Sequence, residues 1–466
     1  MPVFDDKLVL APGDRFRGLL IHSVLGQGAM GTAYLASHPV LRTPLVVKIF
    51  SQREDGDVFQ EAHLAARVRS PHVVGVLDAG YEGGSPFVVQ QYVDGIDLAE
   101  LLSKLMLAEM PMPFDLVVRA AIDIAAGLHA LHQAGVVHQD VKPENLFLRG
   151  SGDALVGDLG IAVDAKARAS GVVAGTPLFM APEQWLGLPL DRRTDEYALG
   201  GTLHALLAGS MPFFAESLEG MRRAHLERAY EAPEARDPRE AYFFAVVARM
   251  LSKDRDDRYP TLAAVADALR PLARPPSAPT GFARAADASD SSLTAELGPL
   301  TLKLARGDLA DAESDVLVNA ANWQLTMNVG VAHALSGRAG PSLQDEARAK
   351  APARMGDIVW TGAGRLKANH VAHAVSALAG AVCIQRCVLR ALLDAEARGA
   401  TSLAMPSLGT GVGEVPMSLG AELALQAITT FASLGPRRLR SVSVVLHTET
   451  AFDAWADTLR GVAPTP

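Results

Sequence analysis

Hydrophobic and polar positions divide the chain into two patterned regions. In the first, short apolar runs of strand length, such as residues 45–50, come before longer stretches with apolar residues at helical spacing, such as 116–135. In the second, strand-like runs such as 315–322 alternate with alanine-rich helical stretches such as 420–435. The first region therefore predicts strands followed by a helical part, and the second predicts an alternating α/β domain.

An unpatterned stretch separates these two regions. Residues 273–297 are rich in Pro, Ala, Ser and Asp and show no apolar periodicity, which is typical of a flexible linker. We therefore expect two domains, at residues 14–272 and 298–464, joined by a linker that lets them move independently or touch.

Composition fits this two-domain interpretation. The chain has 466 residues, too many for one ordinary core, and 49% of them are hydrophobic and 20% charged. The net charge of -9 argues against nucleic acid as the main partner. The acidic N-terminus is unlike a signal peptide, and no apolar run reaches the roughly 18 residues that a membrane span needs. We expect a cytoplasmic protein with no membrane partner.

The chain has 2 cysteines, Cys383 and Cys387, one turn apart on a predicted helix. Two ligands, with no histidine at a familiar spacing, are too few for a structural zinc site. We expect ordinary buried thiols, and so few cysteines also fit a reducing compartment.

The first candidate site residues of the first domain lie in a glycine-rich segment. Gly26, Gly28 and Gly31 match the pattern G-x-G-x-x-G, in which glycine lets the backbone approach phosphates closely. Downstream, Lys48 lies in a predicted strand, and Glu61 lies on a predicted helix from which it could pair with that lysine. Either charge alone would be interpreted as a solvated surface residue, but their order and spacing favour a functional interpretation.

The stretch HQDVKPEN carries the strongest signal in the chain. It places the carboxylate of Asp140, the ammonium of Lys142 and the amide of Asn145 on one short loop. Asp158 follows in an Asp-Leu-Gly sequence and adds a second carboxylate suited to Mg²⁺. An Ala-Pro-Glu sequence at 181–183 marks the end of the segment that begins at Asp158.

Together these motifs resemble a eukaryotic-type Ser/Thr protein kinase of the bacterial kind over residues of about 14–272. The resemblance implies an α+β bilobal protein-kinase fold whose glycine loop covers the phosphates of ATP. It also implies that Lys48 contacts these phosphates and pairs with Glu61, and that Asp140 accepts the proton of the substrate hydroxyl.

The same resemblance assigns the cofactors and the partners. Asn145 and Asp158 would hold Mg²⁺. Lys142 fits the Ser/Thr pattern rather than the Tyr pattern, so the implied partners are protein substrates with Ser or Thr hydroxyls. The residues implied to bind the nucleotide and its metal are Gly26, Gly28, Gly31, Ala33, Val46, Lys48, Gln91, Val93, Asn145 and Asp158.

Some positions of the first domain are implied to have structural roles, and one departs from the family pattern. Asp195 resembles the aspartate that braces the catalytic loop, and Arg258 resembles the buried partner of Glu183. Gln139 stands where many such kinases carry an arginine that receives the phosphate of a modified activation loop. We therefore expect activity without loop phosphorylation.

A second departure concerns the adenine pocket. Ala33 occupies a position where the family usually carries Val, and Val46 one where it usually carries Ala. Both side chains should line the pocket from adjacent strands, so we interpret the pair as an exchange that conserves volume around the base.

The second region carries a different set of motifs. Asp308 precedes the strand-like run that ends in Asn322, and residues 406–413 are glycine-rich after an apolar run. Backbone amides of such a loop can cradle phosphates, although a tight strand-to-helix turn explains the loop equally well. With the stretches at 337–348 and 356–366, these segments resemble a macro domain, the ADP-ribose-binding module.

This resemblance implies a three-layer α/β/α macro domain over residues of about 298–464. It implies that Asp308 binds the adenine amino group of ADP-ribose and that Asn322 lies near its distal ribose. The implied partner is ADP-ribose or an ADP-ribosylated protein. The implied ligand residues are Asp308, Asn322, Gly330, Ser407, Gly409, Thr410, Gly411, Val412 and Gly413.

The second domain also departs from its family pattern. The usual glycine run before Val331 is reduced to Gly330, and the preceding Val329 is stiff and β-branched. Hydrolytic members of the family often carry an aspartate at the position of Ala332. De-ADP-ribosylation by that route is therefore not expected.

The leading prediction is an ATP-dependent Ser/Thr protein kinase with a C-terminal sensor for ADP-ribose or a related nucleotide. One alternative is a nucleotide-binding pseudokinase scaffold, against which the complete set of Lys48, Asp140, Asn145 and Asp158 argues. The other is a bifunctional kinase and ADP-ribosyl hydrolase, against which Ala332 argues.

Overall fold

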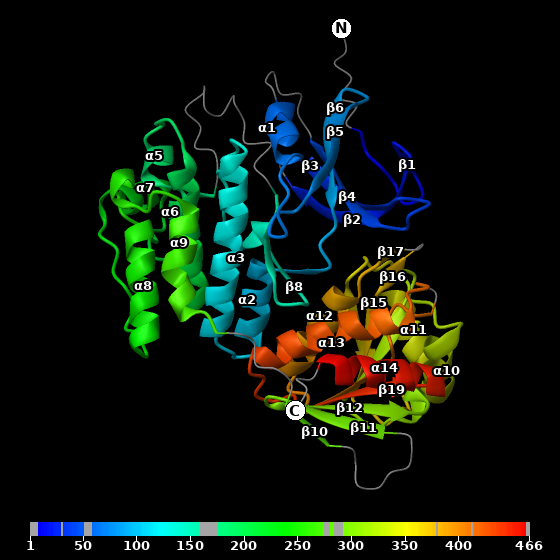
Figure 1. Ribbon diagram of the computed structural model, residues 1–466. Helices are drawn as coiled ribbons and strands as arrows, with labels where there is room; N and C mark the ends of the chain where they lie inside the picture. The colour runs from blue at the N-terminus through cyan, green and yellow to red at the C-terminus, as the bar shows by residue number, and fades with distance from the viewer. Residues whose placement is uncertain are drawn as a thin grey trace.

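The structure is a computed structural model that describes residues 8–28, 31–50, 58–158, 176–274, 280–283, 292–378, 381–411 and 413–462. Two domains are visible in Figure 1, a bilobal first domain and a layered second domain. The second domain lies beside the hinge of the first, the segment of residues 92–95 that joins its two lobes. In the described ranges, no helix combines the length and the apolar character needed to cross a membrane.

The N-terminal lobe of the first domain is a six-stranded sheet with strand order β1-β2-β3-β4-β6-β5. Burial along β4 alternates, so Leu45, Val47 and Ile49 enter a core while Val46 and Lys48 point to the opposite face. The elements of this lobe are β1 (Arg15–Phe16), β2 (Leu19–Gly28), β3 (Gly31–Ser37), β4 (Pro44–Phe50), α1 (Val58–Ala65), β5 (Val76–Glu82) and β6 (Ser85–Gln91).

The C-terminal lobe is mainly helical, with a small sheet of order β7-β8-β9 next to the hinge. Its central helix α6 is buried along most of its length, begins at the capping side chain of Asp191 and ends at Gly209 with a left-handed backbone. The elements are β7 (Gly95–Asp97), α2 (Leu98–Leu107), α3 (Phe114–Gln133), β8 (Leu146–Arg149), β9 (Ala154–Val156), α5 (Pro182–Trp185), α6 (Arg192–Ala208), α7 (Leu218–Glu227), α8 (Pro238–Met250) and α9 (Leu262–Leu269).

The second domain is built on an eight-stranded sheet of order β10-β11-β12-β19-β18-β13-β15-β14. The strands from β12 to β15 in this order pair in parallel, and the edge strands pair antiparallel. The strands are β10 (Thr280–Ala283), β11 (Ser292–Leu297), β12 (Leu300–Arg306), β13 (Val316–Ala321), β14 (Ile358–Gly362), β15 (His370–Val375), β18 (Ser402–Met405) and β19 (Ser441–Leu446), with a separate hairpin of β16 (Ala377–Leu378) and β17 (Ala381–Val382).

Helices cover both faces of this sheet, as the predicted three layers require. Alternate residues of β13 enter different cores: Val316 and Val318 pack with the α12, α13 and α14 side, while Leu317 packs with the α10 and α11 side. The helices are α10 (Gly330–Ala339), α11 (Pro341–Ala349), α12 (Ile384–Ala397), α13 (Met417–Ser433) and α14 (Glu449–Val462).

The predicted linker at 273–297 differs from the structure. Strands β10 and β11 lie inside it, and β11 pairs with β12 along its whole length. Leu293, Ala295 and Leu297 of β11 are buried at every second position, which is the strand period that the sequence interpretation missed. The second sheet therefore begins within the segment that we expected to be a linker.

The predicted thiols, Cys383 and Cys387, are both buried, with their sulfur atoms 3.8 Å apart. Their expected placement on one helix needs a correction, because Cys383 is the residue that precedes α12. The backbone amide of Cys383 donates to the backbone oxygen of Ser376.

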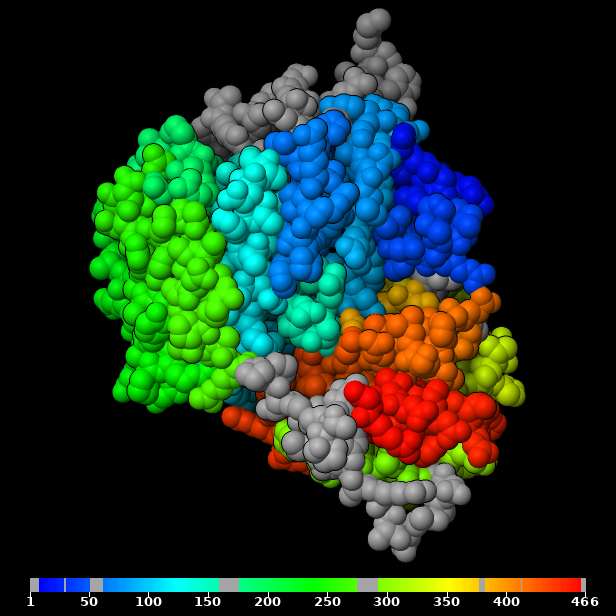
Figure 2. Space-filling model, in the orientation of Figure 1, coloured from blue at the N-terminus to red at the C-terminus, as the bar shows by residue number. Residues whose placement is uncertain are grey.

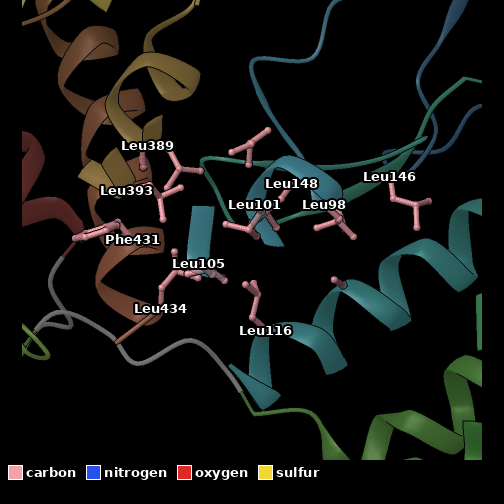
Figure 3. Close-up of a cluster of buried hydrophobic side chains, with 14 of the residues drawn as sticks. Leu98, Leu101, Leu105, Leu116, Leu146, Leu148, Leu389, Leu393, Phe431 and Leu434 are labelled. Atoms are coloured by element: carbon pink, nitrogen blue, oxygen red, sulfur yellow. The ribbon is translucent and has the colours of Figure 1, made fainter. Parts of the chain in front are cut away.

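The two domains share one hydrophobic core. Helix α12 of the second domain contacts α2 and β7 of the first. Figure 3 shows Leu101 and Leu105 of α2 near Leu389 and Leu393 of α12 and Phe431 of α13, and all five side chains are fully buried. In Figure 2 the orange surface of the second domain lies against the cyan surface of the first. The domains therefore touch, which is one of the two arrangements that the sequence left open.

Candidate functional site

A cavity of about 250 Å³ lies beneath the N-terminal sheet, next to the hinge. The alternation along β4 directs Val46 and Lys48 into it, and Ala33 reaches it from β3, where it is the register partner of Lys48. The residues that line the cavity are Leu25, Gly26, Ala33, Val46, Lys48, Val74, Gln90, Gln91, Tyr92, Val93, Asp97, Phe147, Gly157, Asp158 and Arg386.

Many of the predicted nucleotide residues meet in this cavity. Gly26, Ala33, Val46, Lys48, Gln91, Val93 and Asp158 all line it. Gly28 and Gly31 lie outside its lining, where they pair with each other across β2 and β3. A Cβ atom on Gly31 would come within 2.2 Å of the backbone oxygen of Ile49, so this position accepts no side chain without displacing the strand.

An ion pair joins the two lobes at the cavity. The ammonium of Lys48 donates to a carboxylate oxygen of Asp158, which has a left-handed backbone with φ of 47°. The sequence prediction also pairs Lys48 with Glu61, whose side chain lies outside the described part of the structure.

The catalytic-loop residues form one connected group. The Lys142 ammonium lies 2.7 Å from the Asp140 carboxylate and donates to the Thr176 hydroxyl at 2.9 Å. The Asn145 amide nitrogen donates to the backbone oxygen of Asp140 at 2.7 Å and to its carboxylate at 3.0 Å. This arrangement fixes the carboxylate of Asp140 between a cation and an amide.

A buried carboxylate holds the backbone of this loop. Asp195 on α6 is fully buried and accepts hydrogen bonds from the backbone amides of His138 (2.8 Å) and Gln139 (2.7 Å). Its third contact is to the ring of His132, at 2.7 Å. Gln139 has φ of 66°, a conformation that a non-glycine residue keeps only when its surroundings impose it. Asp195 therefore occupies the bracing position expected from the sequence.

The other expected structural pair is also present. Both terminal nitrogens of Arg258 donate to the carboxylate of Glu183, at 2.8 and 3.0 Å, and both side chains are buried. The Thr194 hydroxyl adds a further hydrogen bond to Glu183. The pair ties the Ala-Pro-Glu segment to the end of the domain.

The donor chemistry of Asn145 and Asp158 fits a magnesium ion. Both hydrogen bonds from the Asn145 side chain use its nitrogen, so its oxygen is the atom suited to bind a cation. The backbone amide of Gly157 donates to the backbone oxygen of Asn145 at 2.9 Å and so keeps Asp158 close to the loop. One amide and one carboxylate, completed by phosphate oxygens, are the kind of donors that Mg²⁺ takes. Within the described ranges, no cluster of His, Cys, Asp and Glu forms another metal site.

Sequence reasoning missed several residues of the cavity wall. Leu25 and Phe147 supply apolar surface, and Asp97 places a carboxylate at the cavity beside the hinge. Leu25 and Phe147 adjoin the recognised motifs and could have been found from that proximity. Arg386 belongs to the second domain, and no signal in the sequence connects it with the first.

The predicted ligand residues of the second domain meet at one edge of its sheet. Asn322 follows β13 and Ser407 follows β18, and these two strands are parallel neighbours with Val316 opposite Leu403. The carboxyl ends of neighbouring parallel strands form the usual ligand crevice of an α/β fold. Gly330, with φ of 56°, begins α10 at this edge after β13.

Two of these side chains already have local partners. One carboxylate oxygen of Asp308 accepts a hydrogen bond from the backbone amide of Ala310 at 2.9 Å. The Asn322 amide donates to the Thr326 hydroxyl at 2.7 Å and accepts from the Thr326 backbone amide at 3.2 Å. Asn322 therefore helps to hold its own loop.

The glycine-rich loop at 407–413 is tightly packed. A Cβ on Gly409 would come within 2.9 Å of Ile384 and Val382, and one on Gly413 would come within 2.4 Å of the Gly409 backbone oxygen. Thr410 closes the turn by donating to the backbone oxygen of Ser407 at 3.0 Å. Gly411 has open space around it, and Val412 lies outside the described residues.

Comparisons with known proteins agree with both parts of the architecture. A protein kinase domain model matches residues 20–269, and a macro domain model matches residues 318–424. The fold and the site thus define a protein with a protein kinase domain followed by a macro domain. The chain belongs to the protein kinase family, and the fold class and family expected from the sequence are confirmed.

The curated relatives are bacterial Ser/Thr kinases. The chain is 35% identical over 257 residues to the serine/threonine-protein kinase PknH of Mycobacterium tuberculosis, which covers 53% of this chain and 40% of PknH. It is 33% identical over 261 residues to the serine/threonine-protein kinase Pkn1 of Myxococcus xanthus, covering 53% of this chain and 37% of Pkn1. The chain thus spans less than half the length of these relatives.

Among solved structures, the chain is similar to the kinase domain of M. tuberculosis PknI. The sequence identity is 29% and the TM-score is 0.46, and the match covers 56% of this chain and 98% of that domain.

Proposed function

We propose that this protein is an ATP-dependent Ser/Thr protein kinase that transfers the γ-phosphoryl group of Mg-ATP to protein hydroxyls. The observation that carries the proposal is the group of Asp140, Lys142 and Asn145 on the catalytic loop, with Thr176 bound to Lys142 and with Lys48 and Asp158 facing the neighbouring cavity. We also propose a kinase domain over residues 14–272 and a second domain that begins at β10.

Each side chain has a distinct role in this proposal. Asp140 orients the substrate hydroxyl and takes its proton, and Lys142 neutralises charge beside it. Lys48 holds the nucleotide phosphates. Asn145 and Asp158 would hold Mg²⁺, which neutralises charge on the transferred phosphoryl group.

Phosphotransfer by the full chain with Mg-ATP tests the proposal, with Asp140→Asn as the control. Transfer to the protein itself or to a generic Ser/Thr substrate, lost in the control, is the expected result. If the wild-type chain binds ATP but transfers no phosphoryl group, the pseudokinase scaffold is the correct function.

For the second domain we propose a sensor of ADP-ribose or a related nucleotide. Support comes from Asn322, Gly330 and the 407–413 loop, which follow two neighbouring parallel strands. Calorimetric titration of the full chain with ADP-ribose should give saturable binding, and transfer should differ with and without this ligand. Release of ADP-ribose from a modified protein would instead support the bifunctional hydrolase, which the buried Ala332 argues against.

A further inference from the structure

The wall of the kinase cavity includes one residue from the second domain. Arg386, in the first turn of α12, lines it together with Tyr92, Val93 and Asp97 of the hinge region. We propose that the nucleotide site is composite, with Arg386 as a nucleotide-binding residue contributed by the macro domain. This inference rests on the proposed function, because it takes the cavity to be the ATP site.

The hinge caps the helix that carries this arginine. Cys383 precedes α12 and provides no side-chain cap. Asp94, at the end of the hinge, accepts hydrogen bonds from the backbone amides of Gln385 (3.0 Å) and Arg386 (2.8 Å). A carboxylate in this position satisfies amides that a helix start leaves open and interacts favourably with the helix dipole. The kinase domain thus supplies the N-cap that α12 lacks.

The guanidinium of Arg386 is held by two further contacts with the kinase domain. Its terminal nitrogens donate to the backbone oxygen of Gly95 at 2.6 Å and to the carboxylate of Glu100 at 3.3 Å. A guanidinium has five N–H donors, and these contacts use two of them. Arg386 can therefore stay bound to the hinge and still donate to a ligand in the cavity.

Charge favours the same role. Asp97 gives this side of the cavity a negative charge, and Asp94 and Glu100 contact Arg386. Arg386 places a positive charge beside the Asp97 carboxylate, which would otherwise repel an anionic nucleotide. Burial at the contact raises the pKa of Asp94 to about 6.

The surrounding interface fixes the position of α12. Gly150, in the turn between β8 and β9, packs so closely that a Cβ atom there would lie 2.8 to 2.9 Å from the side chain of Gln385. The Thr430 hydroxyl of α13 donates to the backbone oxygen of Gly150 at 2.6 Å. One turn after Arg386, Arg390 donates to Glu100 at 2.7 Å. These contacts hold the helix that presents Arg386 without themselves reaching the cavity.

The test compares Arg386→Gln with Arg390→Gln in the full chain. Both substitutions remove an arginine of α12 that contacts Glu100, but Arg386 lines the cavity and Arg390 does not. Glu100 keeps a cationic partner in either variant. Thermal unfolding of each variant checks that the chain still folds.

The measurements are the dissociation constant for Mg-ATP, by calorimetry, and the separate KM and kcat of phosphotransfer. Arg386→Gln loses a charged hydrogen bond to the nucleotide, so we expect it to bind Mg-ATP about tenfold more weakly and to show a correspondingly higher KM for ATP. In Arg390→Gln the dissociation constant for Mg-ATP should change by less than about twofold. Arg386→Lys keeps the charge without the planar fork and should lose less affinity than Arg386→Gln.

Two results would overturn the inference while leaving the proposed kinase function in place. One is ATP binding by Arg386→Gln within twofold of the wild type. The other is an equal loss in both glutamine variants, which would assign the effect to domain docking rather than to a contact with the nucleotide. If the wild-type chain binds no ATP, both the proposed function and the inference fail.

Discussion

Replacement of Asp195 by Asn tests how the catalytic loop is held. The carboxylate of Asp195 is fully buried and accepts three hydrogen bonds, from the backbone amides of His138 and Gln139 and from the ring of His132. An asparagine of the same shape has one oxygen instead of two. Its amide nitrogen must therefore face at least one of these donors.

The contacts of Asp195 set the size of the effect. If the asparagine oxygen keeps the contacts to His138 and His132, the side-chain nitrogen of the asparagine faces the backbone amide of Gln139. In the wild type this amide lies 2.7 Å from a carboxylate oxygen of Asp195. Losing one charge-assisted hydrogen bond costs about 1.5–3 kcal/mol, and leaving a buried N–H unsatisfied adds about 1–3 kcal/mol. We expect the free energy of unfolding to fall by about 3 kcal/mol or more, a large part of the roughly 5–15 kcal/mol typical of a domain.

The effect should extend to activity. Without a partner for its amide, Gln139 has less reason to keep its φ of 66°, and Asp140 follows it directly in the chain. We therefore expect kcat to fall in the variant at temperatures where the chain is still folded. Chemical denaturation and phosphotransfer kinetics of the same preparation measure the two effects.

A neighbouring residue provides a matched control. Glu196 is also buried on α6, and burial raises its pKa to about 8, so it is largely protonated at pH 7. Because glutamine resembles a protonated glutamate, Glu196→Gln should change the unfolding free energy by less than about 1 kcal/mol. Equal stabilities of the two variants, or an Asp195→Asn variant as active and stable as the wild type, would refute this account of the loop.

Three further predictions follow from single contacts. Arg258→Lys breaks the bidentate pair and leaves Glu183 partly unpaired in a buried site, so denaturation should show a loss of about 3–5 kcal/mol. Ala33→Val should raise the KM for ATP several-fold by filling the cavity, and adding Val46→Ala should restore it; an unchanged KM in the single variant would contradict the volume exchange. Burial lowers the pKa of His373 to about 4. Below pH 6.5 the unfolded chain therefore binds a proton that the folded chain does not. The free energy of unfolding should fall by up to about 3 kcal/mol between pH 6.5 and 4. Denaturation of His373→Gln at pH 7.5 and 5 should show a smaller pH dependence than the wild type.

Local chemistry made the grouping of the candidate kinase residues predictable. A glycine loop, a strand lysine and a loop with a carboxylate, a cation and an amide each require particular residue types at short spacing. The structure brings Lys48 and Asp158 together and groups Asp140 with Lys142 and Asn145. Even the alternation of β4, which directs Val46 and Lys48 to the cavity, can be inferred from the period of a strand.

Long-range packing was not predictable in the same way. The composition of residues 273–297 concealed β11, because its three apolar residues, Leu293, Ala295 and Leu297, alternate with Ser, Thr and Glu in a segment rich in Pro, Ala, Ser and Asp. The apolar positions of α2 and α12 predict a buried face on each helix, but not that these faces bury each other. Similarly, nothing in the spacing of Asp94 and Arg386 links them, since a hinge carboxylate and a helix arginine each have an ordinary solvated interpretation.

The distribution of contacts between the domains has a consequence for kinase motion. Buried apolar side chains and ion pairs attach α12 to α2 and to the hinge, including Arg390 with Glu100 and Lys104 with Asp394. By contrast, Arg42 of the N-terminal lobe pairs with Glu414 through side chains that are 56% and 66% exposed. An exposed pair of this kind contributes little stability, roughly 0–1 kcal/mol, and salt weakens it.

In the described part of the chain, the second domain is therefore anchored to the C-terminal lobe and the hinge more firmly than to the N-terminal lobe. Kinases close around their ligands by moving one lobe against the other about the hinge. An anchor on the hinge side lets the N-terminal lobe move while Arg386 stays at the cavity wall. Glu414 directly follows the glycine-rich loop of the macro domain, so the exposed pair with Arg42 joins this loop to the N-terminal lobe. Among the described residues, the buried contacts with α2 and the hinge thus fix where the second domain sits, while its exposed pair with the N-terminal lobe adds little to that position.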